Sequence, residues 1–276
     1  MEPVSPELAT AVEAAYRAFA GYRLRGALEV CRCPVCVAEP VERGLCTLPL
    51  RAMPARLLAE YTHSAHGFDA RVADELRHFL PRYFELIAQG DPPSNSGIET
   101  CLGRLHAADW RARWPAAEVA VIEAFFAALL RARLGVPPPI DPLGFPVFDG
   151  DEAEDVLCMV AHAGGDLAGL LAQWDAERGR AATLHVANIV SKADWLKRRL
   201  DNTFWQSCSR RPHVVRAMRA VLAWLLTAEM RERLEHACLA EQDEATAALL
   251  AHAEALVMSA IRRGIDDELC LTPTSC

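Results

Sequence analysis

Residues 115–134 read Pro-Ala-Ala-Glu-Val-Ala-Val-Ile-Glu-Ala-Phe-Phe-Ala-Ala-Leu-Leu-Arg-Ala-Arg-Leu, and this stretch decides the fold class. Its larger apolar side chains recur at the spacing of one helix face, at Val119, Ile122, Phe126, Leu129 and Leu130. Pro115 suits the first turn of a helix, and Gly135 follows the last periodic residue. The stretch therefore predicts a long α-helix with one apolar face.

The same periodicity extends through most of the chain, in which 48 of 276 residues are alanine, the strongest helix former. We expect further helices near residues 5–20, 54–64, 69–89, 98–107, 153–163, 167–175, 180–201, 212–240 and 243–263. Pro81 lies inside one of them and is expected to kink or split it. Since no segment alternates as a strand would, we predict an all-α fold. It would be an irregular helical bundle or a short α-solenoid-like array without a substantial sheet.

A proline-rich segment at 136–152 is the predicted linker between two halves, because it carries five prolines and several turn residues. We predict an N-terminal helical domain at 1–135 with a cysteine-rich turn at 31–46, and a C-terminal helical domain at 153–263. Residues 264–276 are expected to form a frayed tail. The two halves can also pack as one domain.

The formal net charge of the chain is −8, with a pI of about 5.6. Non-specific nucleic-acid binding needs a positive field, so we expect no nucleic-acid partner. The N-terminal residues lack the basic and apolar pattern of a signal peptide. The longest near-unbroken apolar runs, at 124–130 and 221–226, are far shorter than the roughly 18 residues of a membrane span. We therefore expect a cytoplasmic bacterial protein with no membrane partner.

Residues 21–50 contain only two alanines but four of the ten cysteines. Cys33 and Cys36 form a Cys-x-x-Cys pair, and two thiolates at this spacing can hold one zinc ion from a tight turn. The residues that could complete a structural site are Cys31, Cys46, His63 and His66. A structural zinc ion is one interpretation, and reduced thiols that pack a short turn are the other.

The segment from residue 48 to residue 86 concentrates polar and aromatic side chains that core packing alone would not select. The candidate ligand-binding residues in it are Arg51, Tyr61, His66, Arg77, His78 and Arg82. These side chains could line a polar groove for an anionic ligand or an acidic partner. Alternatively, the aromatic residues belong to the core and the arginines make ion pairs or cap helix ends.

Three motifs carry a resemblance: Cys33-Pro-Val-Cys36, Pro49-Leu-Arg51 and Arg77-His-Phe-Leu-Pro-Arg-Tyr-Phe-Glu-Leu86. The segment 20–135 resembles a family of uncharacterised bacterial proteins, and the similarity continues more weakly beyond it. The resemblance implies that the cysteine turn and the Arg-His-Phe-Leu-Pro-Arg segment are signature elements. It brings no known activity and therefore assigns no catalytic residue.

The acidic residues at 149–155 lack the glycine spacing of an EF-hand, so we expect a solvated loop that leads into a helix N-terminus. The chain contains no phosphate-binding loop, nucleophile elbow or His-Glu-x-x-His motif. We therefore predict a non-enzymatic helical interaction or regulatory protein with a protein partner. The alternatives are a zinc-binding protein, and an enzyme whose polar groove is lined by arginine and histidine.

Overall fold

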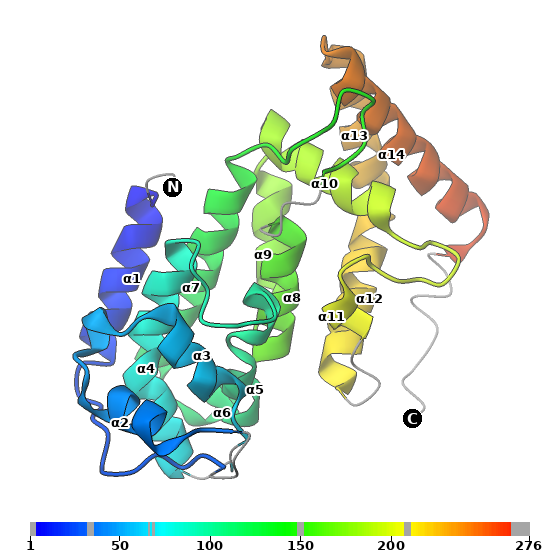
Figure 1. Cartoon of the computed structure of the whole chain (residues 1–276). Coiled ribbons are helices and arrows are strands. Elements are labelled where there is room, and N and C mark those ends of the chain that lie inside the picture. The colour runs from blue at the N-terminus through cyan, green and yellow to red at the C-terminus, as the bar shows by residue number, and fades with distance from the viewer. Residues whose placement is uncertain are drawn as a thin grey trace. The chain divides into compact units, whose positions relative to one another are not determined.

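The computed structural model of the chain describes residues 4–31, 36–65, 67, 70–147, 152–206 and 211–265. These ranges hold helices and loops and no strand, with isolated bridges at Ile140–Pro146 and Asp194–Arg199 (Figure 1). The α-helices are α1 (Pro6–Ala18), α2 (Glu39–Thr47), α3 (Ala55–His63), α4 (Ala70–Ala88), α5 (Gly103–Ala107), α6 (Trp110–Arg113), α7 (Ala116–Leu134), α8 (Ala153–Ala163), α9 (Leu167–Ala176), α10 (Arg180–Lys192), α11 (Thr203–Gln206), α12 (Pro212–Leu225), α13 (Ala228–Ala240) and α14 (Glu244–Arg262). The prediction of an all-α fold is confirmed.

The chain divides into two compact units. Unit 1 comprises Met1–Leu129 together with His162–Asp166, and unit 2 comprises Leu130–Ala161 together with Leu167–Cys276. Of the predicted linker, residues 136–147 form a short loop in which Asp141 N donates to Phe145 O at 2.9 Å, while residues 148–151 lie outside the described ranges. That this segment links two domains stays a prediction.

The core of unit 1 forms where α1 packs on α4 and α4 packs on α7. The hydroxyl of Ser5 caps α1 by accepting from Leu8 N at 3.3 Å, and the helix buries Leu8, Val12 and Ala15. Phe84 of α4 stacks on Phe125 of α7 with 3.8 Å between ring centroids. Pro81 is buried inside α4, which runs unbroken from Ala70 to Ala88, so the proline does not split the helix.

The predicted cysteine-rich turn at 31–46 is a helix in its second part, because α2 occupies Glu39–Thr47. Pro40 stands in the first turn, where its missing N–H costs nothing. The buried Glu42 accepts a hydrogen bond from Leu28 N at 2.7 Å, and Leu45 is buried in the core. Tertiary contacts therefore stabilise a helix that is too short to persist alone.

Two predicted helices in the second half are also too long. The helix expected at 180–201 ends at Lys192, because the carboxylate of Asp194 accepts from Lys197 N at 3.0 Å and closes a turn. The helix expected at 212–240 is broken at Thr227, whose hydroxyl accepts from Met230 N and starts α13. Side-chain caps compete with the helix at both points.

The helix expected at 98–107 is likewise interrupted. A 3-10 turn covers Ile98–Thr100, and α5 begins only at Gly103. The two pieces each bury a large apolar side chain, Ile98 and Leu105. Each piece is therefore held by its own buried apolar side chain, and the single helix that periodicity predicted does not form.

In unit 2, α14 packs on α10 and α13 and buries Leu249, Ala253 and Val257. By length and composition α14 is apolar enough to cross a membrane, although the core helix of a water-soluble fold meets the same test. The predicted tail lies outside the described residues, apart from Gly264 and the buried Ile265.

Candidate functional site

A groove of about 630 Å³ opens in unit 1 between the end of α1, the segment from residue 46 to residue 51, and α4. We call it the Tyr16–Arg51 groove. Its lining residues are Tyr16, Phe19, Ala20, Tyr22, Arg23, Leu24, Cys46, Leu48, Pro49, Leu50, Arg51, His78 and Pro81. Most of these are apolar, and the two charged ones are both arginines.

The helix α1 ends at Ala18, and the residues that follow it form one wall of the groove before the chain meets α4 again at Tyr22. Of the lining residues, Phe19 is only 2% exposed, whereas Leu48 is 41% exposed. Pro49 follows Leu48 and holds the backbone there extended, since its ring fixes the backbone φ angle. An exposed leucine beside a buried phenylalanine leaves apolar surface that another molecule can cover.

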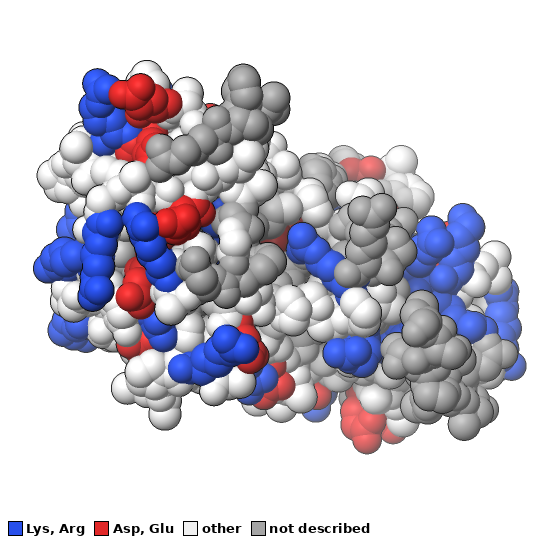
Figure 2. Space-filling view, turned by 90° about the horizontal axis from the view of Figure 1, so that it is seen from below, with Lys and Arg blue, Asp and Glu red and all other residues white. Residues whose placement is uncertain are grey.

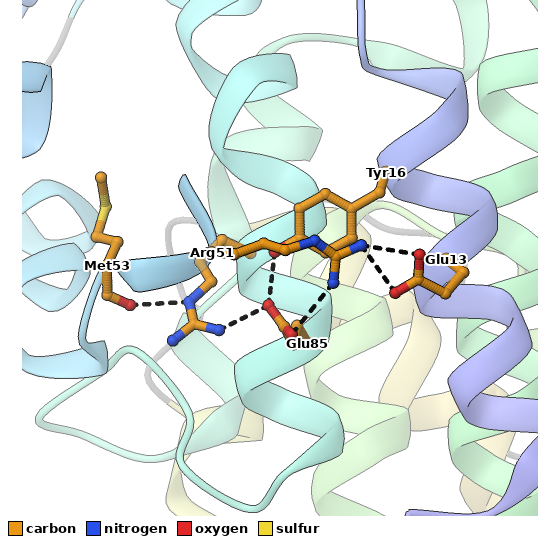
Figure 3. Close-up of polar contacts among 6 residues, drawn as sticks. Glu13, Tyr16, Arg51, Met53 and Glu85 are labelled. Atoms are coloured by element: carbon orange, nitrogen blue, oxygen red, sulfur yellow. Dashed lines mark hydrogen bonds and ion pairs between the residues drawn. The ribbon is translucent and has the colours of Figure 1, made fainter. Parts of the chain in front are cut away.

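Arg51 stands at the edge of the groove between two carboxylates (Figure 3). Its Nη2 donates to both carboxylate oxygens of Glu13, at 2.8 Å each, and its Nη1 lies 3.5 Å from Glu85 Oε1. The guanidinium also covers the Tyr16 ring, with Cζ 3.7 Å from the ring centroid. Three partners therefore hold this exposed arginine in one orientation.

Glu85 is the centre of the network behind Arg51. Its Oε2 accepts from Tyr16 OH and from Arg82 Nη1, both at 2.6 Å, while Arg82 Nε donates to Met53 O at 2.8 Å. Burial and the hydrogen bond to Glu85 raise the pKa of Tyr16 above its usual range, so the phenol stays protonated and donates. Two guanidinium groups face two carboxylates, so the network carries no net charge.

His78 lines the other side of the groove. Its Nδ1 lies 3.1 Å from the carbonyl oxygen of Tyr22, and because a carbonyl only accepts, Nδ1 carries the proton. Burial lowers the pKa of His78, which favours the neutral ring at neutral pH. Nε2 is then the unprotonated nitrogen, able to accept a hydrogen bond.

The other predicted ligand-binding residues lie in different places. Arg77 pairs with Glu118, at 2.9 Å, and with Asp74, and its guanidinium covers the Trp114 ring. Tyr61 is fully buried in the core, and His66 lies outside the described residues. The structure therefore brings Arg51 and His78 to one groove with Arg82 behind it, and places Arg77 and Tyr61 elsewhere.

The predicted zinc ligands are described only in part, since Cys33 and His66 fall outside the described residues. Nε2 of His63 accepts from Asn95 N at 3.1 Å, and Cys46 Sγ donates to Gly26 O at 3.7 Å. The described segments hold no group of three or more side chains suited to a metal, although Cys31 and Cys36 are among them. Structural zinc stays a prediction.

A second polar cluster lies in unit 2 at the start of α8. Glu152, Glu154 and Asp155 are all at most 4% exposed, so the expectation that this acidic stretch is solvated is wrong for them. Lys192 Nζ donates to both oxygens of Glu152, at 2.6 and 2.8 Å. Burial first, and then repulsion by Asp155, raise the pKa of Glu154 to about 8. We call these four residues the buried acidic cluster.

Uncharged groups complete the hydrogen bonds of this cluster. Asn188 donates to Glu152 at 2.9 Å, Asn202 Nδ2 donates to Asp155 at 2.6 Å, and Trp205 Nε1 donates to Glu154 at 3.0 Å. These hydrogen bonds connect the start of α8 to α10 and to the beginning of α11. We interpret the cluster as structural, since most of its carboxyl oxygens already accept hydrogen bonds from these donors.

Sequence reasoning missed Glu13, Tyr16 and Glu85 as members of the groove network. Glu13 and Tyr16 flank the apolar stripe of α1 one turn apart, which was the available signal for a polar edge to that helix. Their partner Arg51 is 38 residues away from Glu13, and no local pattern reports that contact.

Comparison of the chain with protein-family models, with curated proteins and with solved structures finds no match. The function therefore has to follow from the chemistry of the chain's own side chains. The Tyr16–Arg51 groove is the best candidate for a binding site in unit 1, because apolar surface and fixed polar groups meet there.

Proposed function

We propose that the chain is a non-enzymatic binding protein whose Tyr16–Arg51 groove receives an apolar and acidic segment of a protein partner. The observation that carries this proposal is the combination of an apolar wall at Leu48 with a guanidinium held at the rim by three partners. A pre-oriented arginine loses little freedom on binding, and arginine is enriched where proteins recognise one another.

Charge complementarity selects an acidic occupant. Among the described residues that line the groove, Arg23 and Arg51 are charged and none is acidic. Glu13 and Glu85 already balance the charge of Arg51, so the unbalanced charge at the groove is that of Arg23. Arg23 Nη1 donates only to the carbonyl oxygens of Ala20 and Tyr22, so these bonds leave its positive charge unneutralised. A carboxylate on the partner would gain more here than a neutral or cationic group.

A protein segment fits better than a nucleic acid. On the face seen in Figure 2, Lys and Arg side chains lie among Asp, Glu and uncharged ones. Nucleic-acid binding would require a continuous positive surface and is opposed by the net charge of −8. The apolar wall and the mixed charges both favour a peptide that carries leucine-like and glutamate-like side chains.

Fluorescence anisotropy with three labelled peptides of equal length tests the proposal. The first peptide carries Leu and Glu at helical spacing, the second replaces Glu by Lys, and the third replaces Leu by Ser. We expect saturable binding of the first, and at least about fivefold weaker binding of the other two, the size of one exposed charge or one small apolar contact.

Matched variants locate the binding. Arg23→Glu and Leu48→Ser should weaken the Leu–Glu peptide by about fivefold each. Arg25→Glu, an exposed arginine outside the groove lining, and Leu239→Ser, an exposed leucine of unit 2, should leave it unchanged. Equal binding of all three peptides, or equal loss in the control variants, would overturn the proposal.

A further inference from the structure

The loop at 136–147 in unit 2 holds most of the large apolar side chains that are exposed in the described part of the chain. Four of those seven lie in it, namely Val136, Leu143, Phe145 and Val147. Leu143 and Phe145 are the most exposed of the four, at 75% and 61%. Single exposed apolar side chains are ordinary, whereas a concentration of them marks a binding surface. We call residues 136–147 the apolar loop.

The tip of the apolar loop is held in one conformation by its own backbone and by Asp141. Asp141 Oδ1 accepts from Leu143 N at 2.9 Å and from Phe145 N at 2.8 Å, and Gly144 N donates to Asp141 O at 3.0 Å. Gly144 has a φ of +84°, and a Cβ at this position would lie 2.6 Å from Ala245 O of α14. Because the tip is already ordered, its apolar side chains lose little freedom when a partner covers them.

The groove of unit 1 has the properties that complement this loop. Leu48 gives the groove an exposed apolar side chain, and the charge of Arg23 is not balanced there. Asp141 is the one charged residue in the sequence of the apolar loop. Its Oδ1 accepts the two loop hydrogen bonds, and Oδ2 of this partly exposed residue remains able to accept another. The loop thus offers apolar side chains and a carboxylate to a surface that needs both.

We propose that a second copy of this chain is the protein partner, and that its apolar loop occupies the groove. The inference rests on the proposed function of the groove and names the occupant. Leu143 and Phe145 of one copy cover Leu48 of the next, and Asp141 pairs with Arg23. Since the two contacting surfaces differ, the interface is head-to-tail, and the assembly grows with concentration unless it closes into a ring.

Sedimentation velocity of the full chain over a range of concentrations tests the inference, at about 0.15 M salt to screen the net charge of −8. We expect the average mass to rise with concentration above that of one chain. Phe145→Ser should weaken this self-association about tenfold and Leu48→Ser about fivefold, because each removes an apolar contact. Leu239→Ser, at a leucine of α13 that is 81% exposed, should associate as the unaltered chain does.

A mixture of two variants distinguishes the head-to-tail interface from other contacts. The Leu48→Ser chain keeps its apolar loop and the Phe145→Ser chain keeps its groove. At a concentration where each alone is mainly monomeric, the mixture should form a one-to-one dimer that does not grow further. A mixture that stays monomeric would overturn the inference. Self-association that Leu48→Ser leaves unchanged would also overturn it, because the loops would then contact one another.

The peptide experiment separates failure of this inference from failure of the proposed function. If the Leu–Glu peptide binds in the groove but the unaltered chain is monomeric at every concentration, the second copy is not the partner and the proposed function stands. If the peptide does not bind and Leu48→Ser changes neither measurement, both proposals fail.

Discussion

The groove network of unit 1 and the buried acidic cluster of unit 2 both join carboxylates to cations, and they do so in opposite ways. In unit 1 two guanidiniums face two carboxylates, and the outer pair, Arg51 and Glu13, is about half exposed, at 50% and 51%. In unit 2 three carboxyl groups, none more than 4% exposed, lie in a cluster with one lysine, which pairs with Glu152. The charges of the first arrangement balance, and its outer pair is exposed to solvent. In the second, carboxyl groups outnumber cations, and the carboxyl groups are buried.

The difference shows what each region can do. Solvent screens the outer ion pairs of unit 1, so Arg51 can exchange one carboxylate for another at small cost, which suits recognition. The acidic cluster cannot give up a partner without leaving a charge buried, and it relieves its excess of carboxylates by keeping Glu154 protonated near neutral pH.

The largest effect is expected from Lys192→Met, which removes the cation of the acidic cluster. Glu152 would then be a buried carboxylate without its counter-ion, and we expect the free energy of unfolding to fall by about 3–5 kcal/mol at pH 7. Urea denaturation measures it. The chain has only one other lysine, Lys197, whose pair with Asp194 is exposed, so Lys197→Met should cost less than about 0.5 kcal/mol. Similar losses in both variants would show that burial of the Lys192–Glu152 pair does not make it more important than an exposed pair.

The next effect is a pH dependence that Glu154→Gln removes. The pKa of Glu154 is raised from 4.5 to about 8 in the folded chain. Its contribution to stability is therefore complete below pH 4.5 and is lost as the pH rises through about 8. The amide of glutamine replaces the protonated acid at similar shape, so the variant should gain on the order of 2 kcal/mol over the unaltered chain at pH 9.

Denaturation of both chains at pH 5, 7 and 9 checks this prediction. At pH 5 their free energies of unfolding should be close, because Glu154 is protonated in the folded state. A constant difference between them across this range would show that Glu154 does not hold the proton.

Breaking the centre of the unit 1 network should cost less. Glu85→Gln leaves the nearly buried Arg82 without its carboxylate, and we expect a loss of about 1–2 kcal/mol. A double-mutant cycle with Tyr16→Phe isolates the hydrogen bond between Tyr16 and Glu85, whose coupling should be about 1 kcal/mol. Additive effects of the two substitutions would show that the hydrogen bond between Tyr16 and Glu85 does not contribute to stability.

The smallest effect is expected at the rim of the groove. Glu13→Gln breaks the exposed pair with Arg51 and should change the free energy of unfolding by less than about 0.5 kcal/mol. The same variant frees Arg51 and should tighten binding of the Leu–Glu peptide slightly. Weaker peptide binding in Glu13→Gln would mean that orientation of Arg51 matters more than its charge.

Periodicity and alanine content were sufficient to predict the all-α fold, because a helix face repeats over short distances along the chain. The breaks at Asp194 and Thr227 were missed, since each depends on one side chain that competes with the helix for backbone groups. Pro81 does not split α4, and the burial of Pro81 and its neighbours stabilises the helix against the loss of one hydrogen bond.

The sites were only partly predictable for a related reason. Arg51 and His78 were selected by residue type, and the structure brings both to the groove. The burial of Glu154 was missed because its partner Trp205 is 51 residues away. The burial of Arg104 in α5 was missed because Tyr61, whose carbonyl oxygen accepts from it, is 43 residues away. From sequence alone a charged residue is expected to be exposed to solvent, because such residues are seldom buried without a partner. The partners of Glu154 and Arg104 are too distant in the sequence to be recognised.

Hydrogen–deuterium exchange of the full chain, with and without the Leu–Glu peptide, tests the central claim most directly. If the Tyr16–Arg51 groove is the binding surface, backbone amides at residues 19–24 and 44–52 should exchange more slowly when the peptide is bound, and those around the acidic cluster should not change. Protection confined to unit 2, or saturable binding without protection of either groove segment, would contradict the account.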